Sequence, residues 1–137
     1  MSDIDISKLH VLVVDDDVFM RDLLIRSLKE IGTRMISSAE NGYGALTELQ
    51  AALPKVDVIL LDLEMPRMDG FEFLENYIRE VDEKERIPIL VYSGKDLTEV
   101  QENLLKGNVA GMVRKDEVSM EELSVIVKNI YSDSQTP

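Results

Sequence analysis

Residues 56–70 read VDVILLDLEMPRMDG, and this segment indicates the architecture of the chain. Its first part, residues 56–61, is almost entirely apolar and stops at Asp62. A short run that is apolar on both faces is typical of a strand in a parallel sheet that helices cover on both sides. Pro66 and Gly70 then indicate a loop. We therefore expect a buried strand that ends at Asp62 and is followed by a loop and a helix.

Similar runs recur at regular intervals along the chain. Strands are predicted over residues 9–14, 56–61, 87–92 and 109–113, with a weaker edge strand over residues 35–38. Apolar residues at helical spacing predict helices over residues 19–31, 43–53, 71–81, 97–106 and 119–131. This alternation predicts an α/β fold, a doubly wound five-stranded parallel sheet in the flavodoxin-like order 2-1-3-4-5. We expect one domain over residues 8–131, with flexible termini at residues 1–7 and 132–137.

Local signals predict where several helices begin and end. Gly32 and Gly107 follow apolar helical stretches and are good stop signals. Ser119 and Glu122 form a Ser-x-x-Glu capping box at the start of the last helix. Asp17 is interpreted as a cap of the first helix or a solvated residue.

Composition excludes several classes of function. The chain has 137 residues, 15 Lys and Arg, 27 Asp and Glu, and a net charge of −12, which argues against binding to nucleic acid or to an anionic membrane surface. It has no cysteine, which excludes disulfides, thiolate zinc sites and cysteine nucleophiles. His10 is the single histidine and is interpreted as a packing residue of the first strand. We expect a soluble, cytoplasmic domain.

Polar residues follow the predicted strands at the edge where parallel strands of this fold place their ligands. Clustered carboxylates repel each other unless a cation neutralises them, and Mg²⁺ is a hard cation that suits carboxylates and phosphate oxygens together. A lysine opposite the metal and a serine hydroxyl would complete a template for phosphoryl transfer, with a carboxylate as nucleophile. The residues at these ends are Asp15, Asp16 and Asp17, then Asp62, Ser93 and Lys115.

Four segments together resemble the receiver domain of bacterial two-component response regulators, the CheY-like family. The resemblance covers about residues 8–131, and the Asp-x-x-Met-Pro-x-Met-Asp-Gly pattern is its most specific part. The segments are residues 13–17 (VVDDD), 61–70 (LDLEMPRMDG), 92–94 (YSG) and 113–115 (VRK).

The resemblance implies a role for each matching residue. Asp62 corresponds to the phosphoacceptor, which takes a phosphoryl group from a histidine kinase or a histidine phosphotransfer protein. Asp15 and Asp16 correspond to the acidic pair that holds Mg²⁺ together with Asp62, and Glu64 to the position whose main-chain carbonyl completes the metal site. Ser93 and Lys115 correspond to the hydroxyl and the ammonium group that contact the new phosphoryl group.

Phosphorylation in this family shifts a face built by the last two helices and the strand between them, which changes the protein partner. Met112 stands where many receivers have an aromatic residue, and Asp116 stands where many have a cis proline. We therefore expect a trans bond after Lys115. Glu64 and Lys95 lie two residues after Asp62 and Ser93, and we hypothesise that this pair sets the lifetime of the phosphoryl group.

Other residues of the motifs are given structural interpretations. Met65-Pro66 and Asp69-Gly70 are expected to shape the loop after Asp62. Tyr92 alternates with Ser93 and is expected to point away from the site into the core.

Three functions stay open at this level. The leading one is a stand-alone receiver that is not an enzyme and acts through a downstream protein target. The second is a degenerate receiver that docks partners without phosphorylation. The third is a phosphatase that uses Asp62 as its nucleophile, although the general acid of such enzymes would be an aspartate where this chain has Glu64.

Overall fold

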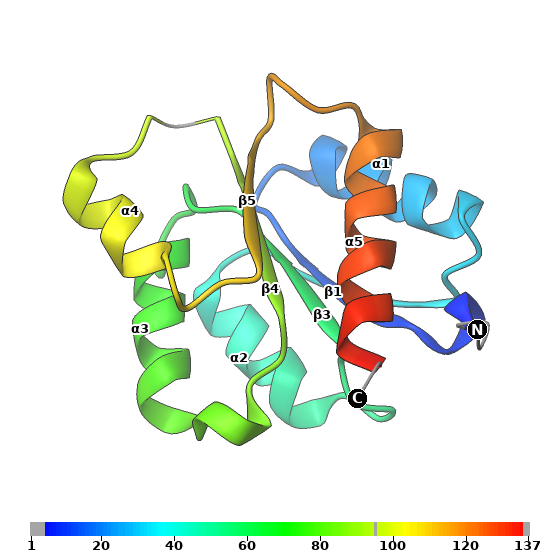
Figure 1. The fold of residues 1–137 in the computed structure, drawn as a ribbon, viewed down its shortest axis with the longest axis horizontal. Helices are drawn as coiled ribbons and strands as arrows, with labels where there is room; N and C mark the ends of the chain where they lie inside the picture. The colour runs from blue at the N-terminus through cyan, green and yellow to red at the C-terminus, as the bar shows by residue number, and fades with distance from the viewer. Residues whose placement is uncertain (1–4, 95, 136–137) are drawn as a thin grey trace.

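The computed structural model describes residues 5–94 and 96–135, and it confirms the predicted fold. Five parallel strands form one sheet in the order β2-β1-β3-β4-β5 (Figure 1). The strands are β1 (His10–Val14), β2 (Met35–Ala39), β3 (Val58–Leu61), β4 (Ile89–Ser93) and β5 (Gly111–Arg114). The α-helices are α1 (Val18–Glu30), α2 (Gly42–Ala51), α3 (Gly70–Glu80), α4 (Glu99–Leu105) and α5 (Met120–Gln135). Two short 3₁₀ helices, η1 (Ile6–Lys8) and η2 (Glu83–Glu85), complete the described elements.

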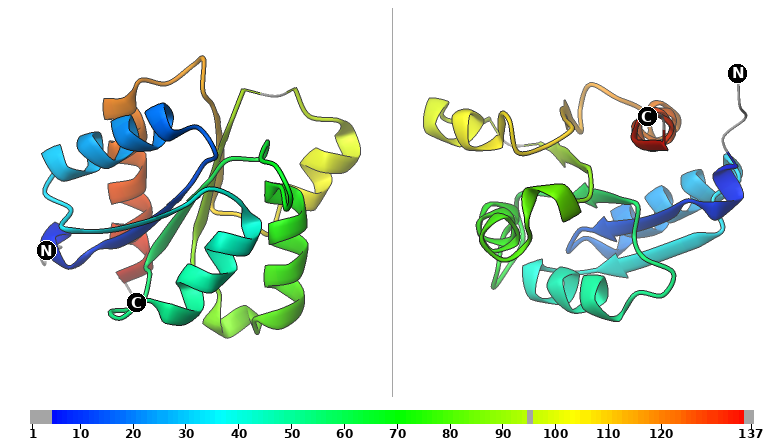
Figure 2. Two further views of the ribbon diagram at one scale, coloured as in Figure 1. Left: turned by 180° about the vertical axis from the view of Figure 1, so that it is seen from behind. Right: turned by 60° about the horizontal axis from the view of Figure 1, so that its bottom comes forward.

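Helices cover both faces of the sheet, as the apolar runs predict (Figure 2). One core lies between the sheet and helices α1 and α5, and the other lies between the sheet and helices α2, α3 and α4. Alternate strand residues enter the two cores: Val13 faces α1 and α5, whereas Val14 faces the opposite side. The central strands are fully buried, which explains why their sequences are apolar on both faces.

The predicted helix signals are confirmed. The Asp17 carboxylate accepts hydrogen bonds from the main-chain N–H groups of Phe19 and Met20 and caps α1. Gly32 has a φ of 104° and follows the end of that helix. At the start of α5, the Ser119 Oγ accepts from Glu122 N–H at 3.0 Å, and the Glu122 carboxylate accepts from Ser119 N–H at 3.0 Å.

Several element boundaries differ from the predicted ones. Pairing of β3 with β1 begins at Val58 rather than residue 56, and β5 begins at Gly111 because Val109 N–H still bonds to the Leu105 carbonyl at the end of α4. Helix α5 continues to Gln135, beyond the apolar stripe that predicted its end at Tyr131. The flexibility expected for residues 1–4 and 136–137 falls outside the described residues.

No helix within the described ranges is both long enough and apolar enough to cross a lipid bilayer.

Candidate functional site

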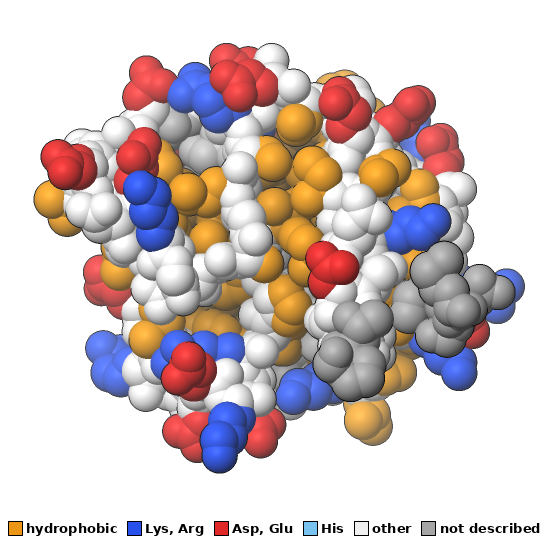
Figure 3. Space-filling model, viewed as in Figure 1, with side chains coloured by type: hydrophobic (Ala, Val, Ile, Leu, Met, Phe, Trp, Pro, Cys, Tyr) orange, Lys and Arg blue, Asp and Glu red, His pale blue; other side chains and the backbone are white. Residues whose placement is uncertain are grey.

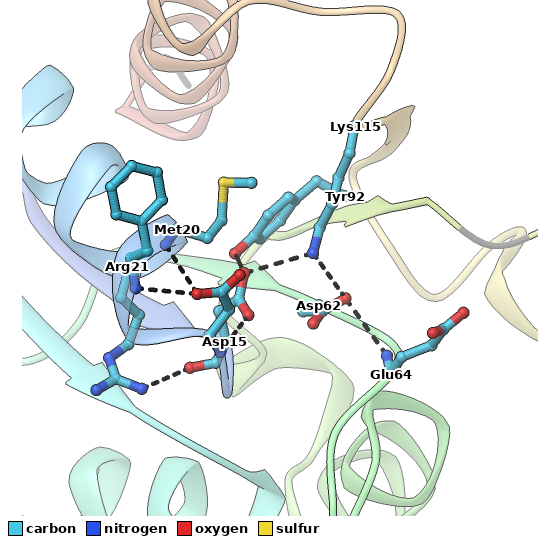
Figure 4. Close-up of polar contacts among 9 residues, drawn as sticks. Asp15, Met20, Arg21, Asp62, Glu64, Tyr92 and Lys115 are labelled. Atoms are coloured by element: carbon cyan, nitrogen blue, oxygen red, sulfur yellow. Dashed lines mark hydrogen bonds and ion pairs between the residues drawn. The ribbon is translucent and has the colours of Figure 1, made fainter.

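The carboxyl ends of three strands bring Asp15, Asp62 and Lys115 together (Figure 4). Main-chain hydrogen bonds continue the sheet at these positions: Asp15 N–H donates to Ala39 O at 3.0 Å, and Asp62 N–H donates to Val14 O at 2.9 Å. The Lys115 Nζ lies 3.5 Å from Asp15 Oδ2 and 3.4 Å from Asp62 Oδ1. The sheet itself therefore fixes the spacing of two carboxylates and one ammonium group.

These residues line a pocket, which we call the acidic pocket. Asp15 and Asp62 are buried at its base, and Asp16 and Glu64 are exposed at its rim. The residues that line it are Asp15, Asp16, Asp17, Asp62, Glu64, Met65, Pro66, Gly94 and Lys115.

The acidic pocket has the donor set of a site for a hard divalent cation. Asp15, Asp16 and Asp62 each offer one carboxylate oxygen, and these three atoms lie within 4.8 Å of one another. Hard cations such as Mg²⁺ take carboxylate and carbonyl oxygens and keep several water ligands, which an exposed third carboxylate allows. The sequence prediction that these three residues converge is confirmed.

Burial and charge perturb the central carboxylate. Desolvation and the neighbouring Asp15 carboxylate raise the pKa of Asp62 to about 6, although the Lys115 ammonium lowers it. The Asp62 Oδ1 also accepts a hydrogen bond from Glu64 N–H at 3.3 Å, which favours the ionised form. In the absence of a bound cation, the Asp15 carboxylate therefore repels the ionised form of Asp62.

The loop after Asp62 is shaped by close packing against α3. A Cβ at Gly70 would lie 2.6 Å from the Asp62 carbonyl oxygen and 2.8 Å from Leu63 Cα. Gly70 N–H donates to Leu63 O at 3.0 Å, and the Asp69 side chain caps α3 through Glu72 N–H. The interpretation of Asp69-Gly70 as residues that shape the loop is confirmed.

Ser93 lies beside the acidic pocket rather than inside it. The residue is 5% exposed and lines a neighbouring hollow, which we call the α4–β5 hollow. Met112, which is 40% exposed, lines the same hollow, and Gly94 takes the place of Ser93 in the lining of the acidic pocket. The residues of the α4–β5 hollow are Val91, Ser93, Leu97, Glu102, Met112, Val113, Arg114, Glu117 and Val118.

The segment after β4 is tied to the end of β5 by an ion cluster. Arg114 pairs with Asp96 at 2.5 Å and with Asp116 at 3.1 Å. The Lys115–Asp116 peptide bond is trans, as expected, and the cis bond of the described residues is Leu53–Pro54. Lys95 lies outside the described residues, so its hypothesised pairing with Glu64 stays a prediction.

Tyr92 is the site residue that sequence reasoning missed. Its ring is buried in the core beneath α1 and α5, as expected, but the prediction that it points away from the site was wrong for the hydroxyl group. The hydroxyl donates a hydrogen bond to Asp15 Oδ2, and the Lys115 Nζ lies 4.8 Å from the ring centroid (Figure 4). Burial and the Asp15 carboxylate raise the pKa of Tyr92, so the hydroxyl keeps its proton.

The alternation of side chains contained a signal for this contact. Asp15 follows the face of β1 on which Val13 points toward α1 and α5, and Tyr92 lies with Leu90 on the matching face of β4. A period of two identifies the shared face, but it does not reveal how far a long side chain reaches along that face.

His10 has the packing role that the sequence predicts. The residue is 5% exposed, with Nδ1 2.8 Å from Pro54 O and Nε2 2.7 Å from Ser37 Oγ. A carbonyl oxygen only accepts, so Nδ1 donates to Pro54 O.

Comparisons with known proteins agree with this geometry. Residues 11–128 match the family model described as the response regulator receiver domain. A Halobacterium salinarum protein named protein-glutamate methylesterase/protein-glutamine glutaminase is 35% identical over 118 residues, which are 84% of this chain and 32% of that protein. A Treponema denticola protein of the same name is 40% identical over 87 residues, 62% of this chain and 22% of that protein. This chain therefore spans a third or less of the length of these relatives.

Solved receiver structures share the fold. The receiver domain of the Francisella response regulator 1452 superposes with a TM-score of 0.80 at 26% identity, covering 93% of this chain and 100% of that one. The chemotaxis response regulator CheY4 of Vibrio cholerae gives 0.74 at 28% identity, covering 89% and 98%. The family match covers most of the chain, and the sheet order and the acidic pocket at the strand ends agree with it. This chain belongs to the response regulator receiver domain family.

Proposed function

We propose that this chain accepts a phosphoryl group on Asp62 from a phosphohistidine of a histidine kinase or a histidine phosphotransfer protein, in a Mg²⁺-dependent reaction. The observation that carries the proposal is the acidic pocket: Asp62 is buried beside Asp15 and Asp16, with the Lys115 Nζ 3.4 Å from its Oδ1. Its residues neutralise and orient a phosphoryl group, which is most of what phosphoryl transfer requires of a protein.

In the proposed reaction, a carboxylate oxygen of Asp62 attacks the phosphorus atom and forms an acyl phosphate bond. The phosphorus–nitrogen bond of the donor breaks, and its electron pair returns to the ring nitrogen. The donor imidazole carries a proton on its other ring nitrogen, so it leaves as neutral histidine. The Lys115 ammonium, already beside Asp62 Oδ1, pairs with a phosphoryl oxygen. Ser93 would contribute its hydroxyl to another phosphoryl oxygen after a movement from the α4–β5 hollow toward the acidic pocket.

The carboxylates of Asp15, Asp16 and Asp62 would hold the Mg²⁺ ion, with the main-chain carbonyl of Glu64 as a further ligand. The ion, when bound, supplies positive charge to the phosphoryl oxygens. The three carboxylate oxygens already lie within 4.8 Å of one another, and oxygen donors of this kind suit Mg²⁺ rather than a softer metal.

The output face in this proposal is formed by α4, β5 and α5. Hydrophobic side chains gather on both sides of β5 between the two helices (Figure 3). Ser93 and Met112 share the α4–β5 hollow, so a movement of Ser93 toward the phosphoryl group would alter the packing around Met112. A downstream protein target that reads this face would distinguish the two states.

The test is phosphorylation by a small acyl phosphate with Mg²⁺, read as intact mass. Wild-type protein should gain one phosphoryl group, and Asp62→Asn should gain none under the same conditions. Chelation of the metal should prevent the gain. Asp82→Asn, which removes an exposed carboxylate away from the pocket, should be phosphorylated like wild type. A wild-type protein that binds Mg²⁺ but gains no phosphoryl group from this donor, and shows no spectral change with beryllofluoride, would refute the proposal.

A further inference from the structure

Asp15 is held by donors on both of its carboxylate oxygens. The side chain has no solvent exposure, Oδ1 accepts from Asp17 N–H at 2.9 Å, and Oδ2 accepts from the Tyr92 hydroxyl. Arg21 donates to the main-chain carbonyl of Asp15 at 2.8 Å and fixes its backbone (Figure 4). The orientation of this carboxylate is therefore determined by its neighbours before any ligand binds.

Tyr92 contacts the two oppositely charged groups at the base of the acidic pocket at once. Its hydroxyl bonds to Asp15, and its ring lies 4.8 Å from the Lys115 ammonium, a distance at which a cation is attracted to an aromatic face. The residue is 1% exposed and packs in the core beneath α1 and α5, so it has little freedom to move. Tyr92 is therefore a rigid residue of the core whose hydroxyl group contacts the base of the acidic pocket.

We propose that Tyr92 is a positioning residue that sets the affinity of the acidic pocket for its metal ion by orienting Asp15, and that seats Lys115 for the phosphoryl group. This inference deepens the proposed function and rests on it. A residue that hydrogen-bonds to a metal ligand fixes the direction of its lone pairs, and loss of such a partner typically weakens metal binding about 10–100-fold.

The chemistry of the hydroxyl group suits this role better than a charged group would. The Lys115 ammonium already lies 3.5 Å from Asp15 Oδ2, and a second cation in place of the hydroxyl would compete further with the metal, whereas a neutral hydroxyl adds no positive charge. Without that bond, Asp15 Oδ2 would keep Lys115 as its remaining side-chain partner among the contacts of the described residues. The ammonium, now 3.4 Å from Asp62 and 3.5 Å from Asp15, would then shift toward Asp15 and away from the phosphoacceptor.

The chain contains a matched control for the loss of a buried tyrosine hydroxyl. Tyr77 on α3 is 3% exposed, and its hydroxyl accepts from Ile87 N–H at 2.8 Å in the opposite core. Tyr77→Phe removes the same group from a buried hydrogen bond without touching the acidic pocket. An effect that both variants show results from the loss of a buried hydroxyl group in general. An effect that only Tyr92→Phe shows results from the lost contact with the acidic pocket.

The experiment measures Mg²⁺ binding by titration calorimetry on wild type, Tyr92→Phe and Tyr77→Phe. Tyr92→Phe should bind Mg²⁺ about tenfold more weakly, and Tyr77→Phe should bind it like wild type. In phosphorylation by a small acyl phosphate, Tyr92→Phe should raise the Mg²⁺ concentration for half-maximal rate more than it lowers the maximal rate. Tyr92→Leu, which also removes the ring beneath Lys115, should lower the maximal rate as well.

The outcomes separate this inference from the proposed function. Equal Mg²⁺ affinity in Tyr92→Phe and wild type, with wild type phosphorylated normally, would overturn the role of Tyr92 alone. A wild-type protein that binds no Mg²⁺ would overturn both. If Tyr92→Phe fails to fold, wild-type protein with ¹³C-labelled tyrosine decides the question. In an NMR titration with Mg²⁺, the signal of the Tyr92 ring should shift with the same midpoint that calorimetry gives, while the signal of the Tyr77 ring stays fixed. A Tyr92 signal that does not move would refute the inference.

Discussion

Asp62→Asn should stabilise the metal-free protein at pH 7, although it removes the proposed phosphoacceptor. Burial and the Asp15 carboxylate raise the pKa of Asp62 from 3.8 to about 6, so the folded state binds its proton more tightly than the unfolded state does. The free energy of unfolding therefore falls as the pH rises from about 4 past 6, and the difference at pH 7 amounts to about 3 kcal/mol. Asparagine is neutral and avoids this cost.

The assay is urea unfolding in the presence of a chelator at several pH values. The gain in stability for Asp62→Asn should be about 3 kcal/mol at pH 7 and should shrink to less than about 1 kcal/mol at pH 4, where wild type carries the proton in most folded molecules. Asp82→Asn controls for the loss of one negative charge from a chain of net charge −12, and it should show no such dependence. A variant no more stable than wild type at pH 7, or a gain that is the same at pH 4, would show that burial does not raise the pKa of Asp62.

Three further substitutions test the supports of the site and the fold by urea unfolding. Gly70→Ala should destabilise the protein by about 1–3 kcal/mol, because its Cβ would meet Asp62 O at 2.6 Å; unchanged stability would contradict this close approach. Ser119→Ala should cost about 1 kcal/mol, because Glu122 N–H loses its cap, and no loss would mean that the cap contributes nothing. Lys115→Met should destabilise the metal-free protein at pH 7 by about 1–2 kcal/mol and raise the pKa of Asp62 further, which carboxyl NMR would detect; an unmoved pKa would exclude Lys115 as its stabilising partner.

The strand ends could be predicted because two independent constraints meet there. Buried parallel strands need apolar residues on both faces, so the polar residue that stops each run marks the end of the strand. This rule identifies Asp15 and Asp62 directly, Lys115 follows Arg114 at the end of the last run, and parallel pairing places all three at one edge. Functional residues at strand ends can be predicted in this fold because the residue that follows each apolar run also lies at one common edge of the sheet.

Features that depend on contact rather than on pattern could not be predicted. Helix α4 begins at Glu99, two residues after the apolar position that suggested its start, because Thr98 and Gln101 form a capping box. The polar end of α5 continues as helix to Gln135 although no apolar residue after Tyr131 indicates it. The sequence pattern predicts the face on which Tyr92 lies, but it does not predict that the hydroxyl group reaches Asp15.

The charges of the acidic pocket explain why a metal should be required for phosphorylation and not merely helpful. The three carboxylates that converge, Asp15, Asp16 and Asp62, and the Lys115 ammonium give a formal charge of −3 + 1 = −2, leaving aside the Asp17 and Glu64 carboxylates that also line the pocket. Conversion of Asp62 to an acyl phosphate adds about one further negative charge to that pocket. A divalent cation brings the starting sum to zero, so the product then carries about −1 instead of about −3. The neutral hydroxyl of Tyr92 orients Asp15 without altering this sum, whereas a second lysine in its place would leave less negative charge to attract the metal. We therefore expect the same charges that destabilise the metal-free site to favour the binding of a divalent cation.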